Sequence, residues 1–280
     1  MELLELFAAN RDCFSYGILS NGSFIDSKTA RRLKKLGTCF VQVSIEGTKG
    51  THEKVRGPDS YEQAVTGLKN LVRHGVPSMI SFTAHRDNYR EFGDVAELGR
   101  KLKVSRVWAD RLIPCGSGSH MENRLLTPEE TEVFFEIMRK ARDRKTWRWF
   151  NRTEISMHRA LQFQAGGGRP YSCSAGDSLI TVQANGDLYP CRRMPVPVGN
   201  LTKDSLKELY DHSDLFRALR DRDRVNEGCE TCFYSKLCRG GLKCLSFAIT
   251  GDPFQADPGC PMKSETREGA GENLVTANIA

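Results

Sequence analysis

The sequence predicts an α/β protein made of a partial (β/α) barrel over residues 1–165 and a small cysteine-rich domain over residues 166–262. Short β-rich runs alternate with helical patterns in the first half, which is typical of parallel strands joined by helices. Seven of the ten cysteines crowd into the last third, where an Asn-Gly pair separates two short apolar runs. The second domain is therefore expected to contain a β-hairpin plus helices and loops. The polar residues 263–280 are expected to form a disordered tail.

The expected elements of the barrel follow the hydrophobic pattern in chain order. Strands are predicted over residues 16–20, 40–45, 79–83 and 106–113. Helices are predicted over residues 27–36 and 92–102, and from Ser60 and Thr127, where Gln63 and Glu130 would complete capping boxes. Four strand–helix units make an open sheet or an incomplete barrel, because a closed eight-unit barrel needs about 250 residues.

Composition and charge exclude several classes of function. The formal net charge is +6, from 41 basic and 35 acidic residues, and no concentrated basic stripe suggests nucleic-acid binding. No apolar run is long enough to span a bilayer, and the opening residues have two acids and no basic segment of a signal peptide. We therefore expect a cytoplasmic protein that binds neither membrane nor nucleic acid.

The cysteine spacing is the most informative feature of the sequence. Cys173 precedes the predicted hairpin and Cys191 ends it. The remaining five follow as Cys229, Cys232, Cys238, Cys244 and Cys260. In a reducing compartment such clustering favours metal binding over disulfides. A two-residue gap also allows the thiolates of Cys229 and Cys232 to point at one centre.

Two kinds of metal centre are compatible with these spacings. Iron–sulfur clusters need four thiolates each, and the flexible Gly240-Gly241 pair would let backbone amides approach the cluster sulfurs. A structural zinc ion could instead be bound by four cysteines, with the other three left as ordinary thiols. That zinc set would be Cys229, Cys232, Cys238 and Cys244. Spacing alone leaves both open, with disulfides as a third reading.

The cysteine-rich region resembles the SPASM domain of radical S-adenosylmethionine (radical SAM) enzymes. The resemblance is carried by seven ordered cysteines and by the following phrases: Tyr171-Ser172-Cys173, Asn185-Gly186-Asp187-Leu188-Tyr189-Pro190-Cys191, Gly199-Asn200-Leu201, Cys238-Arg239-Gly240-Gly241 and Thr250-Gly251-Asp252. It implies an outer cluster held by Cys229, Cys232, Cys238 and Cys260, and an inner cluster held by Cys173, Cys191 and Cys244. This chain departs from the usual CRGGC, because Leu242 occupies the last position and Cys244 follows two residues later. The fourth ligand of the inner cluster is not evident, so that position is either open to substrate or filled from elsewhere.

The first half resembles part of a radical SAM barrel, so that the likeness covers roughly residues 1–262. It is carried by Ser20-Asn21-Gly22, by Val43-Ser44-Ile45-Glu46-Gly47, by His52 with Arg56-Gly57, and by Arg111-Leu112-Ile113-Pro114-Cys115-Gly116. The resemblance implies contacts to S-adenosylmethionine from Ser44, Glu46 and Arg56. The competing readings are a cap or turn for Ser44 and Glu46 and an exposed side chain for Arg56. For His52 and His85 we expect loop roles, and for Cys115 that of a small buried residue.

The resemblance implies a maturase that uses a 5′-deoxyadenosyl radical on a peptide or protein, with two auxiliary iron–sulfur clusters and a reductant such as a flavodoxin or ferredoxin. Pathways to modified haems and peptide-derived redox cofactors are also implied. The sequence contains neither the CxxxCxxC loop nor the Gly-Gly-Glu strand of the family. We therefore expect the C-terminal part of such an enzyme, unable to cleave S-adenosylmethionine alone. The alternatives are a non-catalytic iron–sulfur protein for electron transfer or peptide docking, and a zinc-binding module.

Overall fold

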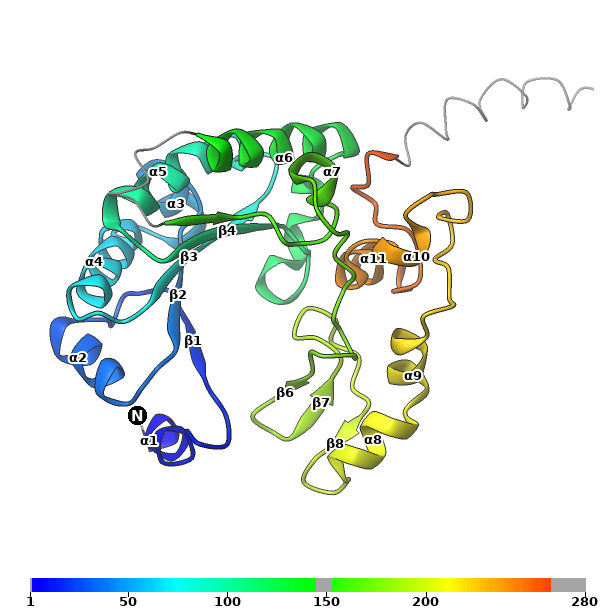
Figure 1. Cartoon of the computed structure of the whole chain (residues 1–280), viewed down its shortest axis with the longest axis horizontal. Coiled ribbons are helices and arrows are strands. Elements are labelled where there is room, and N and C mark those ends of the chain that lie inside the picture. Colours follow the sequence, from blue (N-terminus) through cyan, green and yellow to red (C-terminus); the bar gives the residue numbers. More distant parts are fainter. Residues whose placement is uncertain (1, 145–152, 263–280) are drawn as a thin grey trace, which may run out of the picture. The chain divides into compact units, whose positions relative to one another are not determined.

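The computed structural model describes residues 2–144 and 153–262, which form two compact units (Figure 1). The first unit contains the described residues of 1–112 and 134–157. The second contains residues 113–133 and the described residues from 158 onward. The expected tail at 263–280 lies outside the described residues.

The first unit is built on a parallel sheet whose strands are ordered as in the chain, β1-β2-β3-β4-β5. The strands are β1 (Gly17–Ser20), β2 (Phe40–Ser44), β3 (Ser78–Ala84), β4 (Arg106–Arg111) and β5 (Glu154–Ser156). The helices before β4 are α1 (Glu2–Ala9), α2 (Ser27–Lys35), α3 (Lys49–Arg56), α4 (Ser60–Arg73) and α5 (Phe92–Leu102), with a 3₁₀ turn η1 (Tyr89–Glu91). Helices α2, α4 and α5 lie along one side of the sheet (Figure 1). The four predicted strands are confirmed, whereas α3 and β5 were not predicted.

An aromatic cluster holds this sheet against its helices. The ring of Phe82 on β3 lies 5.6 Å from that of Phe92 on α5 and 6.2 Å from that of Phe134. All three side chains are fully buried. Phe134 belongs to α6 (Pro128–Asp143), which the 3₁₀ segment η2 (Gly116–Arg124) precedes. Burial of each such ring contributes about 2–3 kcal/mol, so this cluster fixes the position of β3, whose end carries part of the candidate site.

One of the two predicted capping boxes is present and the other is wrong. Thr127 Oγ1 accepts from the backbone N–H of Glu130, and a Glu130 carboxylate oxygen accepts from the N–H of Thr127, at 3.2 and 3.0 Å. At α4 the cap is Asp59 in a left-handed conformation, with φ at 62°. The Ser60 hydroxyl donates to the carbonyl of Gly57 instead of accepting from Gln63. Ser60 is therefore the first residue of the helix and not its cap, and its hydroxyl binds the preceding turn.

The second unit contains the predicted hairpin, extended by a third short strand. Strands β6 (Thr181–Val182), β7 (Asp187–Tyr189) and β8 (Gly199–Asn200) form an antiparallel sheet in that order. Gly186 has φ at 90°, which favours glycine, and the Asn200 amide donates to the carbonyl of Asn185 at 3.0 Å. The helices are α7 (Phe163–Gly166), α8 (Leu206–His212), α9 (Asp214–Arg220), α10 (Ser235–Cys238) and α11 (Lys243–Thr250). The α/β class with a small cysteine-rich domain is confirmed.

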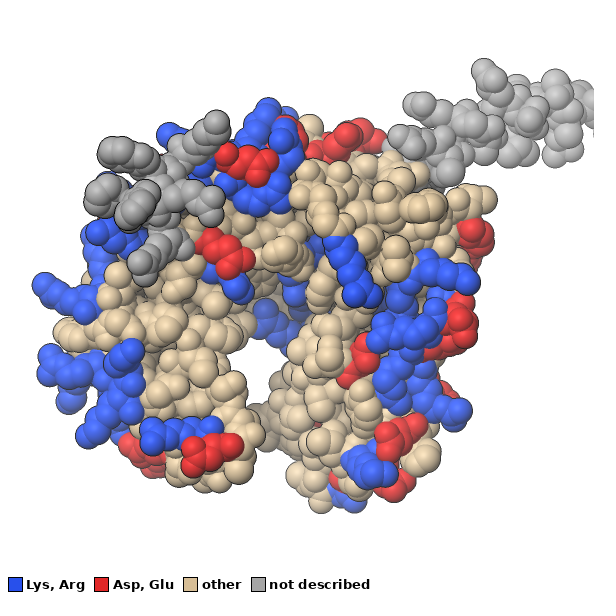
Figure 2. Space-filling view, viewed as in Figure 1, with Lys and Arg blue, Asp and Glu red and all other residues tan. Residues whose placement is uncertain are grey.

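The surface agrees with the mild net charge of the sequence. Basic and acidic side chains lie intermingled on the face drawn in Figure 2. Among the described residues, no helix has the length and apolar character needed to cross a membrane.

Candidate metal and cofactor sites

Four cysteines of the second unit line a single cavity, together with Gly240 and Asp257. These are Cys229, Cys232, Cys238 and Cys260. A tight turn joins the first two, since the N–H of Cys232 donates to the carbonyl of Cys229 at 3.1 Å. Cys238 ends α10, and the N–H of Cys260 donates to the carbonyl of Asp257 at 3.1 Å. The structure therefore brings together the set predicted for the outer cluster, although 21 residues separate Cys238 from Cys260 in the sequence.

The return of Cys260 depends on a clamp between two backbone segments. The Asp257 carboxylate accepts from the N–H of Leu242 at 2.9 Å and from that of Gly259 at 3.0 Å. Gly240 and Gly241 both have positive φ, and a Cβ on Gly241 would lie 2.5 Å from Cβ of Asp257. Glycine is thus required for conformation and for space at position 241. The clamp holds the segment after Cys238 against the segment before Cys260.

Two buried cations lie beside the cysteines. Arg239 donates to the carbonyls of Leu219 and Asp221 at 2.9 and 2.6 Å. The ammonium of Lys243 donates to the Asn226 side chain at 2.6 Å. Burial lowers the pKa of Lys243 to about 8, the neighbouring charge of Arg239 lowers it further, and nearby thiolates oppose this shift. Such cations stabilise negative charge on buried sulfur.

Burial favours the protonated form of Cys238. It raises the pKa of Cys238 to about 12, against the effect of a hydrogen bond from Gly241. A thiolate is the form that binds metal, so a metal cation must replace this proton. The site is therefore suited to a cationic metal centre.

A second group of cysteines surrounds the start of α11. The thiols of Cys191 and Cys244 form a hydrogen bond with each other, and both residues are buried. The N–H of Arg193 also approaches the sulfur of Cys191, at 3.5 Å. These contacts hold the pKa of Cys191 below its ordinary value. Cys173 is half-buried and packs against the apolar cluster that contains both thiols, so the three cysteines predicted for the inner cluster lie in one region.

The donor chemistry of both groups fits iron–sulfur clusters. No disulfide joins cysteines in the part of the chain that the structure describes. Within residues 2–144 and 153–262, no three His, Cys, Asp or Glu side chains gather closely enough to hold one metal ion. The thiolates of an iron–sulfur cluster bind different irons, so their sulfur atoms do not meet at a single ion.

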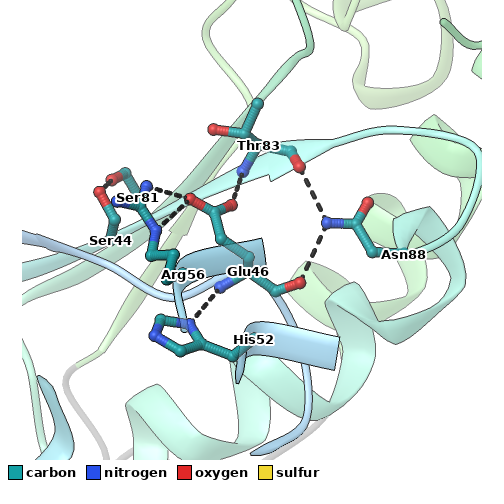
Figure 3. A network of polar contacts seen from close by, with 7 residues as sticks. All are labelled: Ser44, Glu46, His52, Arg56, Ser81, Thr83 and Asn88. Atoms are coloured by element: carbon teal, nitrogen blue, oxygen red, sulfur yellow. Dashed lines mark hydrogen bonds and ion pairs between the residues drawn. The ribbon is translucent and has the colours of Figure 1, made fainter. Parts of the chain in front are cut away.

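A buried polar network follows the ends of strands β2 and β3 in the first unit (Figure 3). The Glu46 carboxylate is 3% exposed, accepts from the N–H of Thr83 at 2.9 Å, and forms an ion pair with Arg56. The hydroxyl of Ser44 lies 3.4 Å from that of Ser81 on the next strand. The predicted cofactor contacts therefore lie close to the C-terminal ends of the strands; they are Ser44, Glu46 and Arg56. The carboxylate of Glu46 already has partners within the chain.

Two further side chains fix the loop after β2. The Asn88 amide donates to the carbonyls of Glu46 and Thr83, both at 3.0 Å. Nδ1 of His52 accepts from the N–H of Glu46 at 3.1 Å. Burial is the main cause that lowers the pKa of His52 to about 4, and the charge of Arg56 lowers it further. His52 is thus a buried helical residue of α3 rather than the expected loop residue, and Asn88 was not singled out from the sequence.

Family models match both parts of the chain. Residues 2–99 match the radical SAM superfamily, and residues 173–233 match SPASM, described as an iron-sulfur cluster-binding domain. These matches, the parallel sheet and the cysteine groups define a radical SAM fold with an iron–sulfur domain. The chain belongs to the radical SAM/SPASM family. Its domains imply iron–sulfur clusters and S-adenosylmethionine as cofactors.

Relatives and solved structures agree with this assignment. The chain is 25% identical to the AdoMet-dependent heme synthase of Methanosarcina barkeri, covering 87% of this chain and 73% of that protein. It is 23% identical to the PqqA peptide cyclase of Gluconobacter oxydans, covering 93% and 73%. The structure resembles anSMEcpe with bound AdoMet, with a TM-score of 0.72, 19% identity and 98% and 75% coverage. It also resembles SuiB of Streptococcus suis, with a TM-score of 0.71, 16% identity and 92% and 63% coverage.

Replacing Gly241 tests the clamp. We expect Gly241→Ala to displace the segment that contains Asp257 and Cys260, because the added methyl group would collide with the side chain of Asp257, beginning at its Cβ. Iron bound after anaerobic reconstitution should fall, because the displaced Cys260 no longer lines the cavity with the other three cysteines. Gly251→Ala is the matched control, since Gly251 also has positive φ but nothing lies within 4 Å of its Cβ position. Equal iron content in both variants would contradict the clamp.

The buried His52 predicts a pH dependence of stability. Its pKa is about 4 in the folded chain and about 6.5 when unfolded, so the unfolded chain binds more protons between these values. Stability from this residue is complete above pH 6.5 and is lost as the pH falls toward 4, by up to about 3 kcal/mol. Urea unfolding of wild type and His52→Asn across this range isolates the effect. Parallel pH curves for the two proteins would contradict it.

Proposed function

We propose that this chain functions within a radical SAM/SPASM maturase, which modifies a peptide or protein by 5′-deoxyadenosyl radical chemistry. We further propose that the chain binds two auxiliary iron–sulfur clusters. The observation that carries the proposal is the division of seven cysteines into two groups within one unit. The SPASM match spans part of both groups. When bound, the clusters supply sites for an electron or for a substrate ligand.

The two cysteine groups receive separate roles in this proposal. The outer cluster is assigned to the four thiols that line the cavity, namely Cys229, Cys232, Cys238 and Cys260. The inner cluster is assigned to Cys173, Cys191 and Cys244, which share an apolar cluster. Arg239 and Lys243 stabilise the negative charge of the thiolates from buried positions.

The edge of the parallel sheet is assigned to S-adenosylmethionine. Ser44 is half-buried at the end of β2, where its hydroxyl can donate to a carboxylate or accept from an ammonium group. Arg56 is part of the wall of a polar cavity that Asn21 and Gln63 also line. Glu46 orients Arg56 through their ion pair. In this assignment Ser44 and Arg56 contact the cosubstrate, while Glu46 fixes the loop that presents them.

A peptide substrate is favoured by the relatives and by the solved structures. One relative is named a PqqA peptide cyclase, anSMEcpe has been solved with the Kp18Cys peptide, and SuiB with the precursor peptide SuiA. A reductant such as a flavodoxin or ferredoxin belongs to the same proposal. A porphyrin substrate is the second candidate, because three relatives at 25% identity are named AdoMet-dependent heme synthases.

Iron analysis tests the proposal. Anaerobic reconstitution should give a brown protein with about eight iron and eight sulfide per chain if both clusters are 4Fe–4S. Cys229→Ala and Cys232→Ala together should lower both by about half, because the pair removes two proposed ligands of the outer cluster alone. Cys39→Ala is the matched control, since Cys39 is exposed and lies in the other unit. A colourless protein that binds zinc more tightly than iron would overturn the proposal in favour of the zinc-binding module.

A further inference from the structure

The inner cysteine group is one thiol short of a complete ligand set. A fully thiolate-bound cluster needs four ligands, and the proposed inner set has three. Cys115 is the remaining cysteine of the second unit. It follows strand β4 in the chain, yet the segment 113–133 makes its contacts within the second unit. The chain therefore carries one cysteine from the end of a barrel strand into the cysteine-rich unit.

Packing places Cys115 in the same cluster of side chains as the inner cysteines. Cys191 and Cys244 are buried members of an apolar cluster that also contains Ile113. Cys115 and Cys173 are both half-buried and both pack against it. Cys115 is thus half-buried against the same apolar cluster as Cys173, a residue that the SPASM pattern assigns to the inner cluster.

The backbone around Cys115 is well fixed. Its N–H donates to the carbonyl of Ile113 at 2.9 Å, and its carbonyl accepts from the N–H of Gly118 at 3.1 Å. Gly116 follows with φ at 56°, a left-handed conformation that turns the chain into η2. These bonds fix the backbone that carries the Cys115 side chain.

Charged neighbours link Cys115 to the same centre. Cys191, Arg192 and Arg193 are all close enough for their charges to act on the Cys115 thiol. Two guanidinium groups beside two thiols can offset the negative charge that develops when both thiols lose their protons. Exposed Cys13 and Cys39, in the other unit, have no part in this arrangement.

We propose that Cys115 is the fourth thiolate ligand of the inner cluster, completing the set of Cys173, Cys191 and Cys244. This inference rests on the proposed function and extends it. With four thiolates, every iron of the inner cluster has a protein ligand, and no iron is open to substrate. The inner cluster then acts on substrate by taking or giving an electron, not by binding it.

Spectroscopy of the inner cluster tests the assignment. The outer cluster is first removed by replacing two of its proposed ligands together, Cys229→Ala and Cys232→Ala, so that the remaining signal belongs to the inner one. In this background, potassium cyanide should leave the electron paramagnetic resonance spectrum of the reduced cluster unchanged. Adding Cys115→Ala should open one iron, so that cyanide shifts the spectrum, or that iron is lost and a 3Fe–4S signal replaces it. Adding Cys115→Ser should give an intermediate spectrum, because an alkoxide is a weaker ligand.

Three results separate the possible failures. Cys39→Ala, added to the Cys229→Ala/Cys232→Ala background, should leave the iron content of that background unchanged and give no response to cyanide. An inner cluster that already responds to cyanide, or that keeps its iron and spectrum in Cys115→Ala, overturns the assignment of Cys115 alone. If Cys191→Ala changes neither iron content nor spectrum, no inner cluster exists, and the proposed function fails together with the assignment. Circular dichroism of each variant confirms that the chain is folded.

Discussion

The burial of several sulfur atoms in a small unit is the constraint on which the rest of the cysteine-rich region depends. Thiolates are costly to bury unless positive charge lies beside them. In this unit, two buried cations, Arg239 and Lys243, stabilise negative charge on sulfur. The backbone N–H of Arg193 also faces the sulfur of Cys191. Burial raises the pKa of Cys238, and a bound metal cation would favour its thiolate. Folding of this region and metal binding are therefore expected to be coupled.

The two units use different devices to fix polar groups. In the cysteine-rich unit, the Asp257 carboxylate binds two backbone N–H groups and joins segments that carry Cys238 and Cys260. In the barrel unit, Glu46 binds a guanidinium and a strand N–H, while Asn88 bridges two carbonyls. Each device satisfies buried polar atoms that would otherwise destabilise the fold, and each leaves nearby groups positioned for a cofactor.

Sequence patterns predicted elements that are long or locally encoded. The four strands of the barrel and the hairpin around Gly186 follow from alternating apolar runs and turn residues. The two short strands β5 and β8 were missed, because segments of three and two residues become strands only through pairing with neighbours. The capping box at Ser60 failed because Asp59 occupies the cap position one residue earlier, in a left-handed conformation that depends on the path of the preceding turn.

The candidate site was also predicted only in part. Ordered spacing and family resemblance singled out seven cysteines, which the structure places in two groups. Cys115 was set aside, because its distance along the chain from the others hides its place in the same apolar cluster. The network of Glu46, His52 and Asn88 was equally hard to foresee, since it depends on how two strand ends meet. The pattern of residues indicated the chemistry, and only the fold indicated which side chains already have partners.

Iron K-edge X-ray absorption of the anaerobically reconstituted chain tests the central claim most directly. The account predicts iron coordinated by sulfur, with other iron atoms as near neighbours. Iron surrounded by oxygen and nitrogen without an iron neighbour, or a chain that retains no iron at all, would contradict it.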